Sequence, residues 1–149
     1  MDETLKNPWF KDGLRFSCTG CGRCCTGSPG YVYLSPRDLS HLAEHQGCSD
    51  EEFKKKFTRV VDDQICLIDT PGSADCYFLK NNRCSVYEAR PVQCRTFPWW
   101  THHLQTPKRW KEAAKHCEGI NSKASLVSVE EITTECMSYL DNLIEQNFF

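Results

Sequence analysis

Four cysteines clustered near the start of the chain carry the strongest chemical signal in this sequence. The segment SCTGCGRCC contains Cys18, Cys21, Cys24 and Cys25. Two-residue gaps separate the first three, and such gaps let a short loop wrap several thiolates around one centre, as in zinc knuckles and ferredoxin loops. The glycines between them supply the backbone freedom that tight wrapping requires. The spacing therefore predicts a metal site.

The adjacent pair Cys24 and Cys25 limits how this site can be built. Neighbouring side chains diverge in most backbone conformations, so either the two thiolates serve different metal ions or one of them stands outside the ligand set. Further thiols follow in the chain, and with the cluster they give eight candidate ligands: Cys18, Cys21, Cys24, Cys25, Cys76, Cys84, Cys94 and Cys117. Eight thiolates suffice for two four-thiolate sites.

The cysteine content also bears on the compartment. Eleven cysteines among 149 residues are about 7%, just under the roughly 8–10% of short secreted disulfide scaffolds. The opening MDETLKNPWF lacks the apolar run of a secretory signal, and no stretch approaches the roughly 20 apolar residues of a membrane span. We therefore expect a cytoplasmic protein with no membrane partner, whose reduced thiols serve metal or redox chemistry.

Charge and motif content exclude several function classes. The 18 Lys and Arg residues are balanced by 20 Asp and Glu, so the net charge is -2 and no basic field favours a nucleic-acid partner. The sequence contains no GxGxxG, P-loop, HExxH or zinc-deaminase motif. None of the five histidines has a recognisable catalytic spacing to a cysteine. Because nothing specifies a substrate, a non-enzymatic role is favoured.

Helical periodicity and capping residues predict helices near residues 36–46, 50–61, 107–117 and 129–146. Ser35 before a proline begins the first, and Thr106 before another begins the third. Ser49 and Ser128 begin capping boxes for the second and fourth. Gly119 is expected to end the third helix with a positive φ. The last helix is expected to pack through one apolar stripe: Val129, Ile132, Cys136, Leu140, Leu143 and Ile144.

Short apolar runs between residues 64 and 87, with a turn at Asn81-Asn82, predict a small hairpin. These elements indicate a fold of the α+β class, a mostly helical small single domain with metal-organised cysteine-rich loops. We expect residues 1–15 to form a loosely held N-terminal arm. Residues 16–149 are then the cysteine-cluster metal-binding domain, in which metal orders the loop at 17–30.

The segments FSCTGCGRCC and CYFLKNNRCSVYEARPVQCRTFPWW resemble the YkgJ-type cysteine-cluster family, a zinc- or iron-chelating domain with a CxxCxxCC signature. The resemblance runs from Phe16 to about Cys117 and includes three pairs of the second signature: Arg90-Pro91, Cys94-Arg95 and Phe97-Pro98. It implies that the chain binds zinc or iron through the cysteines named above. Flagellin lysine N-methylases attach this cysteine pattern to an S-adenosylmethionine-dependent activity, but the extra length of those enzymes is absent here.

The remaining cysteines and the aromatic residues favour packing over chemistry. Three cysteines stand singly among apolar or helical residues and are expected to pack as small hydrophobes: Cys48, Cys66 and Cys136. A wall of the core is expected from Trp99, Trp100 and Trp110. His102 and His103 are expected in a polar loop after the first two of these.

Two arginines flank the candidate ligand Cys94. Arg90 and Arg95 would either neutralise a thiolate site by hydrogen bonding to sulfur or pair with Glu88 or Asp75 at the surface.

Zinc is the expected cofactor, with iron or a [4Fe–4S] cluster as the alternative. A closed four-thiolate site favours a structural or metal-handling role, because catalytic zinc keeps an open position. The alternative is an iron–sulfur protein with redox or S-adenosylmethionine-dependent methylation-type activity. The first three cysteines match a bacterial ferredoxin run, but its fourth cysteine and following proline are missing. A third hypothesis is a module that presents Trp99, Trp100 and the last helix to a protein partner.

Overall fold

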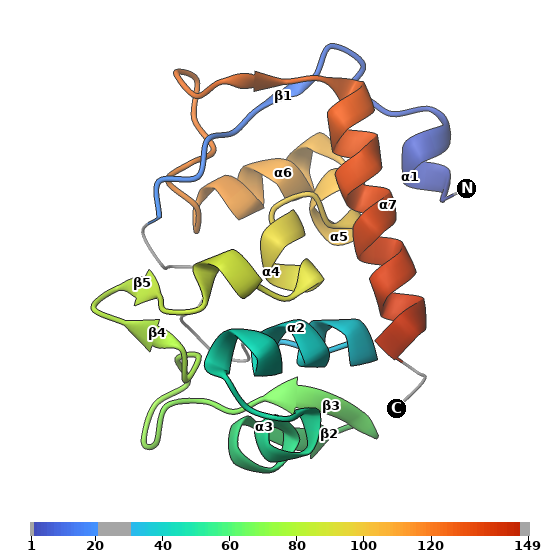
Figure 1. Ribbon diagram of the computed structural model, residues 1–149. Helices are drawn as coiled ribbons and strands as arrows, with labels where there is room; N and C mark the ends of the chain where they lie inside the picture. Colours follow the sequence, from blue (N-terminus) through green and yellow to red (C-terminus); the bar gives the residue numbers. More distant parts are fainter. Residues whose placement is uncertain (1, 21–30, 147–149) are drawn as a thin grey trace.

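The computed structural model describes residues 2–20 and 31–146 of the chain (Figure 1). Its helices are α1 (Glu3–Lys6), α2 (Pro36–Gln46), α3 (Asp50–Phe57), α4 (Val92–Thr96), α5 (Thr101–Leu104), α6 (Pro107–Ala114) and α7 (Val129–Glu145). Its strands are β1 (Leu14–Arg15), β2 (Thr58–Val61), β3 (Gln64–Leu67), β4 (Leu79–Lys80), β5 (Arg83–Cys84) and β6 (Leu126–Val127). The described strands form the antiparallel pairs β1–β6, β2–β3 and β4–β5. The fold is a small, mostly helical α+β domain, as predicted.

Two hydrophobic clusters make up the core, one toward each end of the molecule. The tryptophan cluster lies among α5, α6 and the first half of α7, and its buried members are Leu5, Phe10, Leu14, Trp99, Leu104, Trp110, Ala113, Cys117, Ile120, Ile132 and Cys136. The phenylalanine cluster lies among α2, α3 and β3, and its buried members are Val32, Leu34, Leu39, Leu42, Ala43, Phe53, Ile65, Leu67, Cys76, Phe78 and Val86. Helix α7 runs along one side of the molecule, from the β1–β6 pair to the start of α2 (Figure 1).

The first two predicted helices begin where their caps place them. Ser35 and Asp38 form a complete capping box on α2, and Gly47 ends that helix with a φ of 70°. The second helix stops at Phe57, so its predicted extension to residue 61 is wrong. The next four residues form β2, and the exposed fraction of the Val60 side chain there is 67%. Strand pairing with β3 overrides the helical spacing, because β-branched residues fit a pleated surface well.

The region from 64 to 87 differs in part from the predicted hairpin. The turn at Asn81-Asn82 is confirmed, since both residues have positive φ angles of 51° and 62° and join β4 to β5. Residues 64–67, however, pair with β2 through a turn at Asp62-Asp63, which also has positive φ values. Tyr87 belongs to the short 3₁₀ helix Tyr87–Ala89 and not to a strand.

Helix α6 starts after its Thr106 cap as predicted but ends at Ala114, so the expected extension to residue 117 is wrong. Gly119 is not among the described glycines with positive φ. It is needed for a different reason, because a Cβ on Gly119 would collide with the carbonyl oxygen of Ser17. The early end of the helix frees the following residues to run beside the N-terminal segment.

Helix α7 starts after Ser128 as predicted, but its two halves bury different chemistry. Ile132 and Cys136 are fully buried in the first half. In the second half the buried residue is Asn142, whereas Ile144 has an exposed fraction of 63%. The predicted apolar stripe is therefore wrong at Ile144, since the end of the helix packs on polar partners.

Residues 2–15, expected to be loosely held, are anchored to the tryptophan cluster. Leu5 and Phe10 are buried there, and the indole N–H of Trp9 donates to the carbonyl of Leu104 at 2.8 Å. The β1–β6 pair holds the end of this segment against Leu126 and Val127, shortly before α7.

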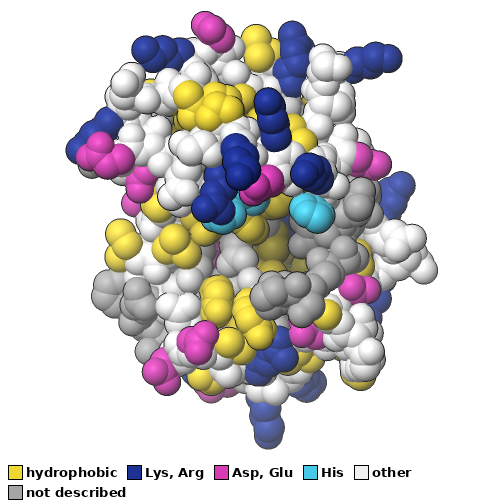
Figure 2. All heavy atoms as spheres, turned by 180° about the vertical axis from the view of Figure 1, so that it is seen from behind, with side chains coloured by type: hydrophobic (Ala, Val, Ile, Leu, Met, Phe, Trp, Pro, Cys, Tyr) yellow, Lys and Arg dark blue, Asp and Glu magenta, His cyan; other side chains and the backbone are white. Residues whose placement is uncertain are grey.

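Both signs of charge occur on the surface, and Figure 2 shows Lys, Arg and His side chains along one rim of a hollow that has hydrophobic side chains inside it. No helix in the described part of the chain is long and apolar enough to cross a membrane.

Candidate metal centre

Five of the eight predicted ligands lie in the described residues. Cys18 is exposed, Cys76 and Cys117 are buried, and Cys84 and Cys94 are partly buried. The others, Cys21, Cys24 and Cys25, lie outside the described residues.

The chain around Cys18 runs beside the segment that carries Cys117. The backbone N–H of Ser17 donates to the carbonyl of Gly119 at 3.0 Å. The hydroxyl of Thr19 donates to the carboxylate of Glu118. Because Gly119 has no Cβ, the backbone of Ser17 can approach it closely. The chain that leads into residues 21–30 is therefore fixed next to Cys117.

The chain that leaves residue 30 is fixed next to Cys94. The side-chain oxygen of Gln93 accepts from the N–H of Tyr33 at 3.1 Å, and its amide donates to the carbonyl of Tyr31 at 2.8 Å. The indole N–H of Trp100 donates to the carbonyl of Gln93 at 3.0 Å. Helix α4, which carries Cys94, is thus hydrogen-bonded to the chain that follows residue 30.

The turn between β4 and β5 brings Cys76 and Cys84 to one place. The N–H of Leu79 donates to the carbonyl of Cys76 at 3.0 Å, and Leu79 is also the strand partner of Cys84. Burial raises the pKa of the Cys76 thiol to about 11, and the nearby Cys84 and Asp69 add to the rise. Cys76 is therefore costly to ionise unless a cation lies close to it.

Cys76, Cys84 and Cys94 share the phenylalanine cluster. Cys76 is one of its buried members, and Cys84 and Cys94 pack against it from the side. Cys117 belongs to the tryptophan cluster instead. The structure therefore brings three of the predicted ligands to one cluster and places Cys117, with Cys18 nearby, at the other.

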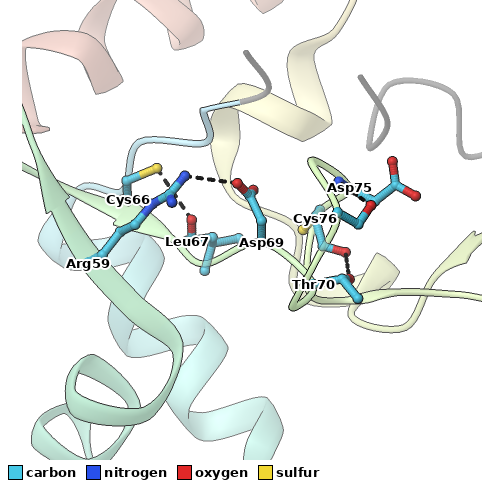
Figure 3. A network of polar contacts seen from close by, with 8 residues as sticks. Arg59, Cys66, Leu67, Asp69, Thr70, Asp75 and Cys76 are labelled. Carbon is cyan, nitrogen blue, oxygen red and sulfur yellow. Dashed lines mark hydrogen bonds and ion pairs between the residues drawn. The ribbon is translucent and has the colours of Figure 1, made fainter. Parts of the chain in front are cut away.

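An arginine that the sequence did not single out lies beside this region (Figure 3). Arg59 pairs with Asp69 at 3.0 Å and hydrogen-bonds to the thiol of Cys66. The same thiol contacts the carbonyl of Leu67 at 3.4 Å. Burial raises the pKa of Cys66, although the guanidinium acts in the opposite direction. Only the strand pairing of β2 with β3 brings these residues together, so no sequence spacing signals them.

Arg90 makes a contact that neither of its two predicted roles includes. Its guanidinium carbon lies 3.8 Å from the ring centroid of Tyr87, and its Nε donates to the Tyr87 carbonyl at 2.9 Å. Arg95 is exposed on α4.

Trp99 and Trp110 form a wall of the core, as predicted, whereas Trp100 is only partly buried and is not a member of the tryptophan cluster. The rings of Trp99 and Trp110 stack with centroids 5.3 Å apart, and both side chains are buried. His102 and His103 belong to helix α5, so their placement in a loop is wrong. The Nδ1 atom of His103 lies 2.9 Å from the carbonyl oxygen of Pro98, which holds the ring in place.

The cysteines expected to pack as hydrophobes do so. Cys66 and Cys136 are fully buried, and Cys48 packs against the phenylalanine cluster.

Within residues 2–20 and 31–146, no three His, Cys, Asp or Glu side chains converge in a way that could hold a metal ion.

Comparison with known proteins agrees with the cysteine pattern. A family model described as "CxxCxxCC: Putative zinc- or iron-chelating domain" matches residues 17–118. A curated protein of Methanocaldococcus jannaschii, named "Uncharacterized protein MJ0661", is 26% identical over 100 residues, which are 66% of this chain and 52% of that protein. The chain thus spans about half the length of this relative. No solved structure matches. Because the family model covers more than half of the residues, the chain belongs to the CxxCxxCC family of zinc- or iron-chelating domains.

Proposed function

We propose that this protein holds zinc through the thiolates of its clustered cysteines, in a structural or metal-handling role. The proposed ligands are Cys18, Cys21, Cys24, Cys25, Cys76, Cys84, Cys94 and Cys117. The observation that carries the proposal is that the chain enters the segment 21–30 beside Cys117 and leaves it beside Cys94.

The two ends of this segment are held by different parts of the fold. Ser17 is bonded to Gly119 at one end, and Tyr31 is bonded to Gln93 at the other. A segment whose ends are fixed loses less conformational entropy when its side chains take up one arrangement around an ion. Both ends also lie next to a predicted ligand from the second half of the chain.

The donor set fits a thiophilic divalent ion. A cysteine thiol binds zinc only after losing its proton, and a nearby zinc ion favours that loss. The Cys76 thiol, with a pKa of about 11, has the thiol of Cys84 and the carboxylate of Asp69 as neighbours. A dication bound there would offset the repulsion among these groups. Because the described residues hold no complete ligand set, the segment with Cys21, Cys24 and Cys25 is proposed to complete it.

A closed thiolate site of this kind stabilises the fold and does not catalyse a reaction. Structural zinc with four protein ligands leaves no position for a water or substrate. Zinc bound to the loop and to cysteines of both halves would cross-link α4, the β4–β5 hairpin and the segment after α6. The proposed role is therefore to hold the loop and these elements in one arrangement, or to keep the ion for transfer.

Two serine substitutions and one control test the ligand assignment. In Cys21→Ser and Cys76→Ser, we expect the bound metal per chain and the melting temperature to fall together, because each change removes a thiolate. Elemental analysis and thermal unfolding monitored by circular dichroism measure the two quantities.

Cys136→Ala is the matched control, because Cys136 is a buried cysteine like Cys76 but is not one of the proposed ligands. We expect its metal content to equal that of the unaltered protein. Unchanged metal content in both serine variants, or loss of metal in the control, would contradict the assignment.

A further inference from the structure

We infer that Asn142 of α7 and Asp38 of α2 act together as positioning residues for the metal centre, by fixing the helix that carries Cys94. This inference rests on the proposed function and extends it to a part of the chain beyond the family match, since α7 begins after residue 118.

Asp38 is a buried carboxylate that joins three elements. Its Oδ2 atom accepts from the N–H of Ser35 at 3.0 Å and from the side-chain amide of Asn142 at 3.1 Å. Its Oδ1 atom accepts from the N–H of Val92 at 3.0 Å. The exposed fraction of Asp38 is 4%, so water cannot readily replace these donors. The two oxygens of one side chain therefore set the relative positions of α2, α4 and α7.

Helix α4 depends on this contact because it is short and lacks a cap of its own. It has five residues, and its N-cap residue, Pro91, provides no side-chain hydrogen bond. Isolated helices of this length are unstable in water. The N–H of Val92 is one of the unsatisfied donors that every helix start presents, and Asp38 satisfies it from another helix. The carboxylate thus caps α2 and α4 at once, and Cys94 follows Val92 by two residues.

Asn142 keeps the carboxylate in this orientation. It has an exposed fraction of 4% and occupies a position where the apolar pattern of α7 is interrupted. A buried amide in such a position costs free energy unless it is hydrogen-bonded, and Asp38 is its partner. On the same side of the helix, the ring of Tyr139 stacks on Trp100 at 5.5 Å. Helix α7 therefore supports the start of α4 twice, through Asp38 at Val92 and through Trp100, whose indole N–H donates to the carbonyl of Gln93.

Removal of the amide donor leaves Oδ2 with Ser35 as its remaining partner. The orientation of the carboxylate is then less restricted, so the hydrogen bond from the N–H of Val92 to Oδ1 is weaker and α4 is held less firmly. The position of the Cys94 thiolate becomes less defined, so metal affinity should fall even where the fold persists. Partners that orient metal ligands affect affinity in this way.

Asn142→Leu tests the inference, because leucine keeps the volume and removes the donor. We expect the zinc dissociation constant, measured by competition with a chromophoric chelator, to rise about 10-fold. We also expect the ligand-field spectrum of the Co²⁺-loaded protein to change, which a loss of global stability alone would not cause. Ile132→Val is the matched control, since Ile132 is a buried residue of the same helix without contact to Asp38. It should lower the melting temperature and leave both readouts unchanged.

Exchange of the polar pair provides a second, independent test. In Asp38→Asn, one of the two acceptor oxygens becomes an NH2 donor, so the N–H groups of Ser35 and Val92 can no longer both be accepted, and we expect zinc affinity to fall. The double variant Asp38→Asn with Asn142→Asp restores an amide-to-carboxylate bond in the opposite sense and keeps an oxygen for Val92. We expect it to bind zinc more tightly than Asp38→Asn alone, and this comparison decides the question if Asn142→Leu does not fold.

The outcomes separate the two proposals. Failure of the unaltered protein to bind Zn²⁺ or Co²⁺ would overturn the proposed function itself. Normal metal binding by the unaltered protein, with an unchanged dissociation constant and spectrum in Asn142→Leu and no recovery in the double variant, would overturn the positioning role alone.

Discussion

The tryptophan cluster and the phenylalanine cluster are both hydrophobic, but they differ in the elements and side chains that border them. Around the first, Trp99 stacks on Trp110, and the N-terminal segment covers it with Phe10. Around the second, the elements besides α2 and α3 are strands of two to four residues and their turns. Three cysteines pack at its edge: Cys48, Cys84 and Cys94.

This difference indicates which region is stabilised mainly by apolar burial and which would gain from the proposed metal. Large aromatic side chains bury enough surface to stabilise the first region without a cross-link. Two-stranded ribbons are marginally stable on their own. The second region therefore has more to gain from an ion that joins its hairpin, its short helix and the cysteine loop.

Removal of metal should have the largest effect, and it should separate the two regions. With a chelator under reducing conditions, we expect amide hydrogen exchange to accelerate strongly in β4, β5 and α4. Protection should persist in α6 and in the first half of α7. Structural zinc contributes on the order of 10 kcal/mol in small zinc domains, so partial unfolding is the expected result. Uniform loss of protection across both regions would remove the distinction.

Trp110→Ala should act on the first region alone. The exposed fraction of Trp110 is 8% and its ring stacks on Trp99, so truncation should lower the free energy of unfolding by about 3–5 kcal/mol. Metal content should stay close to that of the unaltered protein, because the truncation removes packing surface and no thiolate. Denaturant unfolding and elemental analysis provide the two measurements, and metal loss in a folded variant would show that the regions are coupled.

Gly119→Ala probes the point at which the first region holds the cysteine loop. An added methyl group collides with the Ser17 carbonyl, and strain of this kind costs about 1–3 kcal/mol. Metal affinity should fall as well, since the start of the loop shifts. Gly47→Ala is a useful comparison, because a Cβ at Gly47 meets no atom within 4 Å. The φ of 70° at this position is strained for alanine but not for glycine. It should cost stability and leave affinity unchanged.

Acid should weaken the first region through His103. Burial lowers the pKa of this side chain, the charge of His102 acts in the same direction, and the Pro98 carbonyl opposes them. Because the folded state binds this proton less readily than the unfolded chain does, stability should decrease as the pH falls through the ordinary histidine value of 6.5. His103→Gln should flatten the dependence of the unfolding free energy on pH in that range. An identical dependence in the variant would assign the effect to other groups.

The smallest effect is expected at Val60. Its side chain is 67% exposed on β2, so Val60→Thr, which keeps the β-branch, should change stability by less than about 0.5 kcal/mol. Val60→Pro should cost far more, because the strand pairs with Ile65 at this position. A large loss in the threonine variant would favour the buried helical position that the sequence pattern suggested.

Features that depend on neighbouring residues were predictable from the sequence. Ser35 and Ser128 mark helix starts because the cap and its partner lie three residues apart. Asn81-Asn82 marks a turn because asparagine tolerates positive φ. The cysteine pattern identified the family for a similar reason, since its signature is local spacing.

Features that depend on distant partners were not predictable. The role of Gly119 follows from the approach of Ser17, and β2 follows from pairing across a turn. Asp38 reads as a helix cap, but its bond to Val92 spans 54 residues and its bond to Asn142 spans 104. No periodicity reveals such a partner. For the same reason the sequence named the cysteines but not the residues that hold α4.

Metal analysis of the unaltered protein tests the central claim most directly. The protein would be purified anaerobically without a metal-affinity step, then measured by plasma mass spectrometry and ultraviolet–visible absorption. We expect a colourless protein with about one or two zinc ions per chain. Brown protein with near-stoichiometric iron and labile sulfide would contradict the assignment of zinc and favour an iron–sulfur protein. Protein that is folded and free of bound metal would contradict the proposed function as a whole.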